Sequence, residues 1–280
     1  METRIIHHGI PGSFSHSAAV KIFGQNNTFI SAENFNDVFA AVSKNKADFG
    51  VVPIENSLAG SIYENYDYLS KCNLRIAAEH QLKIEHHLIG LLKQRITHIF
   101  SHQKAFEQCR EFLKKLPHVT TMICSDTAAA VKHVSEQRNI HFAAIAGMEA
   151  AKLYNLLVLK KNIEDNPRNF TRFLVISNHQ KSVKNADKCS ITFALKHQPG
   201  SLHNALKIFA ENNLNLTKIE SRPIHGKPFE YIFYIDFEFN SKSLPKVRRI
   251  LNVLKKQSER LKILGFYKKH HHASSQKNHR

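Results

Sequence analysis

The stretch FGVVPIENS (residues 49–57) joins an apolar run to a polar end. Residues 49–54 predict a short buried strand, because the apolar run is continuous and stops at polar residues. Open α/β sheets bind their ligands beyond the carboxyl ends of such strands, which is where Asn56 and Ser57 stand. Asn56 offers an amide that donates to a carboxylate or a hydroxyl without adding charge. Glu55 is better interpreted as one half of a structural ion pair.

Apolar runs and helical patterns alternate on both sides of this stretch. Phe35, Val38, Phe39 and Val42 recur at i, i+3, i+4 and i+7, which predicts a helix with one buried face. Strands that alternate with helices predict an α/β fold with a mainly parallel sheet. The other expected strands begin at residue 5 and span 88–92, 96–100, 143–146 and 173–176, and the other expected helices span 106–113, 127–134 and 148–153.

A polar segment at residues 179–188 separates this part from a second one with a different order of elements. Pro199 and Gly200 predict a turn before its first helix, at which the backbone can approach a neighbour closely. The sequence of elements is the βαββαβ order of ferredoxin-like domains. The expected strands span 190–195, 215–222, 230–237 and 262–267, and the expected helices span 201–211 and 245–258.

The net charge of +17 is unevenly distributed. From Lys242 onward there are twelve Lys and Arg residues against one acid, Glu259, so this end of the chain supplies +11. The preceding 241 residues carry +6, which suits a small anionic substrate. No nucleic-acid-binding motif and no interleaved aromatics accompany the charge, so no nucleic-acid partner is expected.

Several protein classes are excluded by what the sequence lacks. No apolar run reaches the roughly 18 residues of a membrane span, and residues 1–9 lack the apolar core of a signal peptide. The four scattered cysteines are typical of a reduced, cytoplasmic protein. No Gly-x-Gly-x-x-Gly or phosphate-binding loop is present, so no cofactor is expected. The adjacent pairs His7-His8 and His86-His87 point apart, so no metal site is expected either.

Six segments, taken in order, resemble the prephenate dehydratase family over about residues 9–267. The resemblance implies the decarboxylating dehydration of prephenate to phenylpyruvate in L-phenylalanine biosynthesis. It departs at His102-Gln103-Lys104, where the family commonly has His-Pro-Gln, and Lys104 adds charge near a site for a dianion. The six segments are GSFS (12–15), VPIENS (52–57), SH…QC (101–109), DTAAA (126–130), NFTRF (169–173) and ESRP (220–223).

The same resemblance implies how the chain is divided into domains. Residues 1–178 would form a two-lobed, periplasmic-binding-protein-like catalytic domain, whose lobes span about 1–78 with 157–178, and 79–156. Residues 179–188 would be a linker, 189–267 a ferredoxin-like ACT regulatory domain, and 268–280 a basic, His-rich tail of low apolar content. Because the catalytic pattern begins within about ten residues of Met1, no chorismate mutase domain is expected.

Prephenate carries two carboxylates, and its ring becomes aromatic when a hydroxyl and carbon dioxide leave together. An enzyme for this step has to hold the dianion and place a proton donor at the leaving hydroxyl. The resemblance makes Thr171 the main catalytic group, but a free hydroxyl is a weak acid, so Thr171 needs a polarising neighbour. From the residues alone, Thr171 and Arg172 could simply begin the strand 173–176, and Arg172 could hold either a substrate carboxylate or a structural partner. The substrate-binding positions that the resemblance implies are Ser13, Asn56, Ser57, Ser101, Gln108, Thr127, Asn169, Arg172 and Phe173.

Two segments, PGSL (199–202) and ESRP (220–223), match the effector motifs of ACT domains. They imply L-phenylalanine as effector, bound where ACT domains pair edge to edge in a homodimer or homotetramer. Two rival functions stay open. Arogenate dehydratase performs the same chemistry on a substrate with an amino group in place of the keto oxygen, and a non-catalytic amino-acid-binding sensor would share the two-lobed fold. The effector positions are Pro199, Gly200, Ser201, Leu202, Glu220, Ser221, Arg222 and Pro223.

Overall fold

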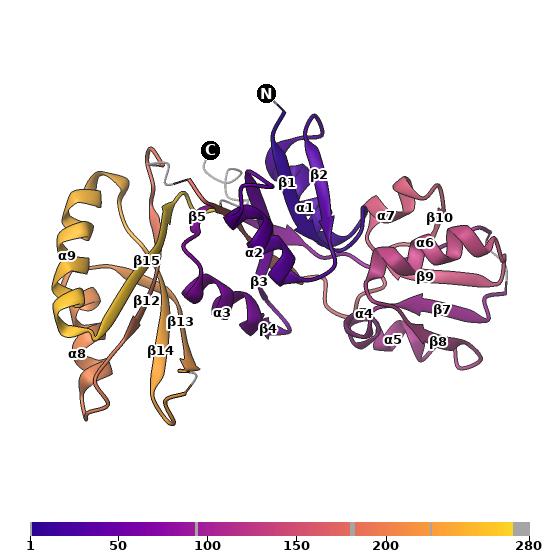
Figure 1. The fold of residues 1–280 in the computed structure, drawn as a ribbon. Helices are drawn as coiled ribbons and strands as arrows, with labels where there is room; N and C mark the ends of the chain where they lie inside the picture. Colours follow the sequence, from indigo (N-terminus) through magenta and orange to yellow (C-terminus); the bar gives the residue numbers. More distant parts are fainter. Residues whose placement is uncertain (1, 93–94, 180–182, 225, 271–280) are drawn as a thin grey trace, which may run out of the picture. The chain divides into compact units, whose positions relative to one another are not determined.

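The computed structural model describes residues 2–92, 95–179, 183–224 and 226–270 (Figure 1). The chain divides into two compact units. Unit 1 comprises Met1–Ile62 and Gln81–Phe173, and unit 2 comprises Tyr63–His80 and Leu174–Arg280. The segment 63–80 therefore belongs with the C-terminal part of the chain, although both of its ends continue into unit 1. No helix among the described residues is long and apolar enough to cross a membrane.

The N-terminal sheet has the strand order β2-β1-β3-β11-β5, and the short β4 pairs with β3. Strand β1 is parallel to both β2 and β3, with Ile5 opposite Phe29 on one side and Phe49 on the other. Helix α2 buries Val38, Phe39 and Val42, so the predicted amphipathic helix is confirmed. The elements are β1 (Arg4–His8), α1 (Phe14–Phe23), β2 (Thr28–Ala32), α2 (Phe35–Ser43), β3 (Phe49–Asn56), β4 (Gly60–Ser61), β5 (Arg75–Lys83) and β11 (Phe170–Ser177).

The second sheet of unit 1 has the order β10-β6-β9-β7-β8. Strand β7 is parallel to β8 and β9, whereas β6 is antiparallel to β9 and to β10. The expectation of a mainly parallel sheet is wrong here, since only two of the four pairings are parallel. The order of the elements explains this: among the described residues no helix lies between β6 and β7, so no helical crossover makes β6 run parallel to its neighbours. The elements are β6 (His87–Gly90), β7 (His98–Ser101), α4 (Gln103–Gln108), α5 (Arg110–Leu113), β8 (Thr120–Ile123), α6 (Thr127–Gln137), β9 (Phe142–Ala146), α7 (Met148–Leu153) and β10 (Leu157–Lys160).

The single helix expected over 106–113 is interrupted at Cys109. Its φ of −124° is not helical, and its side chain is fully buried. The carboxylate of Asp165 accepts hydrogen bonds from the backbone N–H groups of Arg110 (2.9 Å) and Glu111 (3.0 Å). A new helix starts there because an outside acceptor satisfies N–H groups that would otherwise bond within one longer helix.

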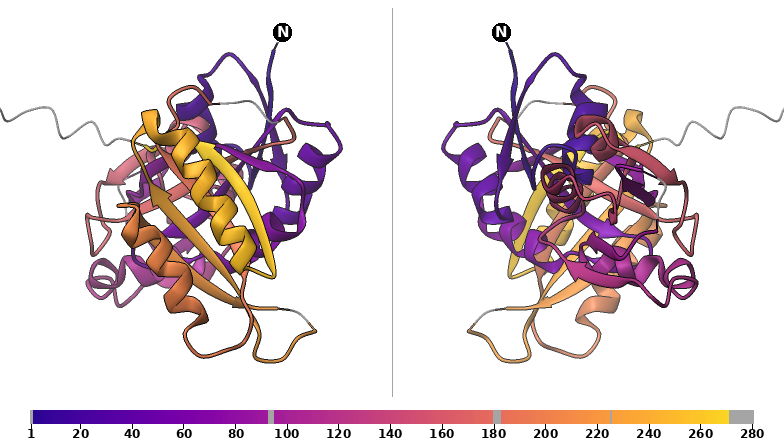
Figure 2. Two further views of the ribbon diagram at one scale, coloured as in Figure 1. Left: turned by 90° about the vertical axis from the view of Figure 1, so that its left-hand side faces the viewer. Right: turned by 90° about the vertical axis from the view of Figure 1, so that its right-hand side faces the viewer.

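Unit 2 contains a four-stranded sheet of order β13-β14-β12-β15, with antiparallel pairing at every junction. Helices α8 and α9 cover one face of this sheet (Figures 1 and 2) and bury Phe193, Phe209, Phe237 and Leu254 against it. The predicted βαββαβ order is therefore confirmed. The elements are β12 (Lys188–Ala194), α8 (Ser201–Glu211), β13 (Asn215–Pro223), β14 (Tyr231–Glu238), a 3₁₀ turn (Ser241–Ser243), α9 (Leu244–Gln257) and β15 (Arg260–Tyr267).

Polar contacts join this sheet to the segment 63–80, which contains α3 (Tyr63–Lys71) and the start of β5. Tyr234 donates its hydroxyl hydrogen to the carbonyl of Tyr66 at 2.9 Å. The ammonium group of Lys262 bonds to the carbonyls of Leu69 and Ser70 at 2.7 and 3.1 Å, which neutralises the C-terminal end of α3.

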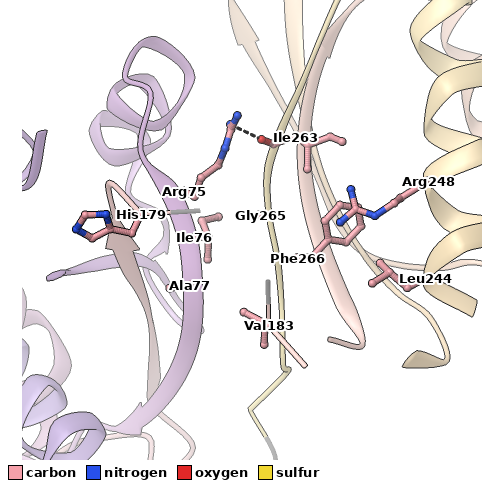
Figure 3. Close-up of a pocket in the computed structure, with 10 residues that line it drawn as sticks. All are labelled: Arg75, Ile76, Ala77, His179, Val183, Leu244, Arg248, Ile263, Gly265 and Phe266. Atoms are coloured by element: carbon pink, nitrogen blue, oxygen red, sulfur yellow. Dashed lines mark hydrogen bonds between the residues drawn. The ribbon is translucent and has the colours of Figure 1, made fainter. Parts of the chain in front are cut away.

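A cavity of about 290 Å³ lies beside β5 and β15 (Figure 3). Arg75 Nη1 donates to the carbonyl of Ile263 at 2.6 Å, and the guanidinium of Arg248 lies 4.7 Å from the ring centre of Phe266. A Cβ at Gly265 would overlap the carbonyl oxygen of Ile76, so glycine allows the two strands their close approach. Residues 180–182 of the predicted linker and 271–280 of the predicted tail lie outside the described residues.

Candidate active site

A cavity of about 480 Å³ in unit 1 is lined by polar ends of several elements from both of its sheets. Of the residues singled out in the sequence, Ser13, Asn56, Gln108, Thr127, Thr171 and Phe173 line it. Cavities of this size are typical of sites for small molecules.

Asn56 and Thr171, 115 positions apart in the chain, meet at this cavity. Asn56 Nδ2 donates to Thr171 Oγ1 at 2.9 Å, and it also lies 3.2 Å from the carbonyl oxygen of Phe170. Among the described residues, Asn56 is the one hydrogen-bond partner of the Thr171 hydroxyl. Since that oxygen accepts a hydrogen from Asn56, its own hydrogen is available to donate to a ligand. Asn56 is thus in a position to polarise the Thr171 hydroxyl.

Asn169 connects Asn56 to Gln108. Asn169 Oδ1 accepts from Asn56 Nδ2 at 2.7 Å, and Asn169 Nδ2 donates to Gln108 Oε1 at 3.0 Å. Asn169 is fully buried and does not line the cavity itself. It therefore fixes the side chains of Asn56 and Gln108 on either side of it, and it does not reach the cavity surface where the resemblance implied a substrate-binding residue.

Two helices begin at the cavity wall. Ser13 accepts from the backbone N–H of His16 at 3.2 Å and so caps α1, and Asp126 accepts from the N–H of Ala129 at 2.7 Å and so caps α6. Thr127 is the first residue of α6. The N-terminal end of a helix carries partial positive charge, which favours an anionic ligand at α1, whereas at α6 the Asp126 carboxylate already offsets this charge.

Besides Asn169, three further predicted site residues do not line the cavity. Ser57 braces the loop before β11, because its Oγ accepts from the backbone N–H of Phe170 at 2.9 Å. Ser101 is fully buried and donates to the carbonyl of Ile145 at 2.6 Å, which ties β7 to β9. Arg172 lies 4.0 Å from the Glu55 carboxylate. Two roles were left open for Arg172, and the structure favours the structural one, because Glu55 is the partner that an ion pair requires.

His86 was missed as a site residue, because only its metal-binding potential was considered. It lines the cavity, its side chain is 2% exposed, and its Nε2 lies 2.8 Å from Gln108 Oε1. Burial lowers the pKa of His86, although the hydrogen bond to Gln108 and the nearby Glu164 oppose this effect. His86 lies between β5 and β6, directly before β6, so the rule that singled out Asn56 at the carboxyl end of a strand does not find it. Within the described residues, no group of three potential metal ligands comes together.

The predicted effector residues lie in unit 2. Gly200 precedes α8 with a φ of +79°, and Ser201 lines two hollows of about 560 and 160 Å³. Leu202 lines the smaller hollow. Pro199 lies directly before Gly200, and the other four residues, 220–223, belong to β13, an edge strand of the sheet.

Two charged residues of β13 have partners within unit 2. Glu220 lies 3.7 Å from Lys218, and Arg222 forms an ion pair with Asp67 at 3.0 Å. The Arg222 guanidinium also lies 4.6 Å from the ring centre of Tyr63. Arg222 thus connects the predicted effector strand to α3.

The geometry can be compared with known proteins. The family model "Prephenate dehydratase" matches residues 5–181, and the model "ACT domain" matches residues 190–256. A bifunctional chorismate mutase/prephenate dehydratase of Aquifex aeolicus is 36% identical over 95% of this chain and 74% of its own length. The chloroplastic arogenate dehydratase/prephenate dehydratase 1 of Arabidopsis thaliana is 37% identical over 95% of this chain and 72% of its own.

A solved structure leads to the same family. The crystal structure of prephenate dehydratase from Arthrobacter aurescens in complex with L-Phe superimposes with a TM-score of 0.85 and 30% sequence identity, covering 95% of this chain and 90% of the other. The two-lobed α/β fold with a C-terminal ACT domain, expected from the sequence, is confirmed by these matches. This chain belongs to the prephenate dehydratase family.

Proposed function

We propose that this chain converts prephenate to phenylpyruvate, carbon dioxide and water, as a step of L-phenylalanine biosynthesis. The supporting observation is the bond from Asn56 to Thr171, which leaves the Thr171 hydroxyl as a hydrogen donor at the wall of the cavity. In this function Thr171 holds the leaving hydroxyl through that hydrogen. The N-terminal end of α1, which the neutral Ser13 caps, favours an anionic ligand.

The apolar part of the wall suits the loss of carbon dioxide. Phe14, Pro53, Ile84 and Phe173 line the cavity beside the polar groups. A carboxylate next to such side chains loses hydration that it would keep in water, and it recovers no strong ion pair in exchange. The bound substrate is therefore less stabilised at the carboxylate that departs than at the hydroxyl that must be held.

The test is the formation of phenylpyruvate from prephenate by the purified protein, with and without added L-phenylalanine. Turnover that falls when phenylalanine is added supports both the reaction and its feedback regulation. No turnover with prephenate but turnover with arogenate would replace the substrate, and a relative of this chain carries both names. No turnover with either substrate would leave the binding sensor as the function and would overturn this proposal.

Regulation is assigned to the C-terminal domain. The effector would be L-phenylalanine, bound near residues 199–202 and 220–223, in a homodimer or homotetramer that pairs along its ACT domains. The edge position of β13 supports this pairing, because an edge strand offers backbone groups to a second copy. The proposal also includes a cytoplasmic location. It divides the chain into a catalytic domain (1–178), a linker (179–188) and an ACT domain (189–267). Light scattering with and without phenylalanine tests the assembly.

A further inference from the structure

The tautomer of His86 follows from a chain of side-chain amides that begins at the backbone. Asn56 Oδ1 accepts hydrogen bonds from the N–H groups of Leu58 (3.0 Å) and Ala59 (2.8 Å). Backbone N–H groups only donate, so the oxygen of the Asn56 amide faces them and its nitrogen faces Asn169. The orientation of the Asn56 amide is therefore fixed by the turn that follows β3.

The same reasoning continues to His86. Because Asn169 Oδ1 accepts from Asn56, Asn169 Nδ2 faces Gln108, and Gln108 presents Oε1 to it. That oxygen carries no hydrogen, so the second group on it, His86 Nε2 at 2.8 Å, has to donate. Neutral His86 consequently carries its proton on Nε2, and its Nδ1 is a bare lone pair.

The lone pair of His86 is isolated and the residue is held in place. Within the part of the chain that the structure describes, the buried Nδ1 has no hydrogen-bond partner. The backbone N–H of His86 donates to Glu164 Oε2 and its carbonyl accepts from the N–H of Ile163, both at 2.9 Å. The ring of Phe14 stands nearly perpendicular to the imidazole at 5.6 Å. An unpaired polar atom in such a position costs free energy, which is typical of functional sites.

The charged groups around His86 leave a dianion poorly balanced. Glu164 lies beside its backbone, and His87, which lowers its pKa, follows it. The permanent cation of the wall, Lys104, is paired at 2.8 Å with Glu107. The wall further contains the carboxylate of Asp126 and the imidazoles of His8 and His102, and Arg172 does not line it. A substrate with two carboxylates therefore meets little fixed positive charge.

The reaction itself requires a proton. Prephenate enters with two negative charges, whereas phenylpyruvate leaves with one, together with neutral carbon dioxide and water. One proton is consumed in each turnover. Thr171 can donate a hydrogen bond to the leaving hydroxyl, but it supplies no net proton unless another group replaces the one it gives.

We propose that His86 brings in the proton that the reaction consumes, an assignment that rests on the proposed function. The negative charge of the bound dianion draws a proton onto Nδ1, because a nearby anion favours the charged form of an imidazole, and the repulsive lone pair becomes an imidazolium N–H donor. That proton passes to the leaving hydroxyl while Thr171 holds it. The carbon–oxygen bond breaks, its electron pair departs with water, and the electron pair of the carbon–carboxylate bond completes the aromatic ring as carbon dioxide leaves.

Two substitutions separate this role from a structural one. His86→Gln places an amide N–H near Nε2 and keeps the bond to Gln108, but it removes the group that titrates. His86→Asn places a polar atom near Nδ1 and loses the bond to Gln108. His118, which is exposed, provides the matched control His118→Gln.

The readout is kcat/KM for prephenate between pH 6 and 9. His86 is neutral in the free protein, because burial holds its pKa below the ordinary value, so the wild type should lose kcat/KM by up to about tenfold per pH unit as binding requires proton uptake. His86→Gln should show a flat profile that lies about 10²-fold lower at pH 6 and meets the wild type near pH 8. His86→Asn should be flat and lower still, and His118→Gln should retain the wild-type slope.

The outcomes that would overturn the proposal are distinct from a failure of the proposed function. A His86→Gln profile that keeps the wild-type slope, at any absolute rate, would show that His86 does not supply the proton. A wild type that does not turn over prephenate would instead remove the function and this inference with it. ¹⁵N NMR of histidine-labelled Thr171→Ala, which should bind prephenate without fast turnover, gives a second readout. The His86 signals should change from the Nε2–H tautomer to the doubly protonated ring when prephenate is added, and an unchanged neutral ring would refute the proposal.

Discussion

Lys188 and Glu79 form an ion pair at 3.0 Å in which the two side chains are only 7% and 1% exposed. Lys188 begins β12, and Glu79 lies on the part of β5 that belongs to unit 2. The pair therefore anchors the regulatory sheet on the segment 63–80. A few residues after Glu79, the chain reaches Ile84 and His86 in the wall of the candidate site.

Removal of one member of this pair should destabilise the protein strongly. Lys188→Met leaves the Glu79 carboxylate buried without its cation, and breaking a buried pair in this way typically costs about 3–5 kcal/mol. Urea denaturation followed by circular dichroism measures the change. The double variant Lys188→Met/Glu79→Met should be more stable than either single variant, because no charge is left buried. A double variant as unstable as the sum of the two singles would contradict this account.

Thr171→Ala should lower kcat by about 10²-fold or more, the range for groups that act on proton transfer. The fold should be retained, since the variant removes one hydroxyl and one methyl group. Thr171→Ser is the matched control, because it keeps the hydroxyl that accepts from Asn56, and it should stay within about tenfold of the wild type. A Thr171→Ala variant within a few-fold of the wild type would remove Thr171 from the mechanism.

Asn56→Asp tests the amide chain with a change of almost no volume. A carboxylate still accepts from the N–H groups of Leu58 and Ala59, so the turn should persist. It no longer donates to Thr171 and it adds negative charge beside a dianion, so kcat/KM should fall by at least about 10²-fold. The control is Asn166→Asp, because Asn166 also accepts from a backbone N–H, that of Arg168, but lies outside the cavity. Equal activity of the two variants would contradict the role given to Asn56.

The sequence predicted those helices and strands in which the buried residues are apolar and lie on one face or in one continuous run. Helix α8 (Ser201–Glu211) and helix α7 (Met148–Leu153) have the expected bounds. Helix α3 was not predicted, because it buries Asn65 and Tyr66 as well as Leu69 and so lacks an apolar stripe. Strand β5 was missed because its buried positions recur every third residue instead of every second. Both elements carry polar contacts to the C-terminal sheet, so their burial depends on a partner far away in the sequence.

The candidate site shows the same limit. Its residue types were recognisable, but spacing does not reveal that Asn56 contacts Thr171 or that Ser101 turns away to bond with Ile145. The location of Asn56 could be predicted because a parallel strand ends there. The orientation of its amide could not, because that depends on backbone groups of a turn and on side chains more than a hundred residues away.

Gly200→Val should abolish inhibition by L-phenylalanine while leaving the uninhibited rate unchanged. A φ of +79° is strained for a β-branched residue, so the start of α8 should shift and displace Ser201 and Leu202 from the hollows that they line. The measurement is the phenylalanine concentration that halves phenylpyruvate formation. Gly226→Val is the matched control, because Gly226 has a φ of +80° in the same domain and a Cβ added there would meet no atom within 4 Å. Inhibition that persists in Gly200→Val would contradict the assignment of the effector site to this turn. Inhibition that disappears equally in Gly226→Val would show that backbone strain anywhere in this domain, and not the Gly200 turn, accounts for the effect.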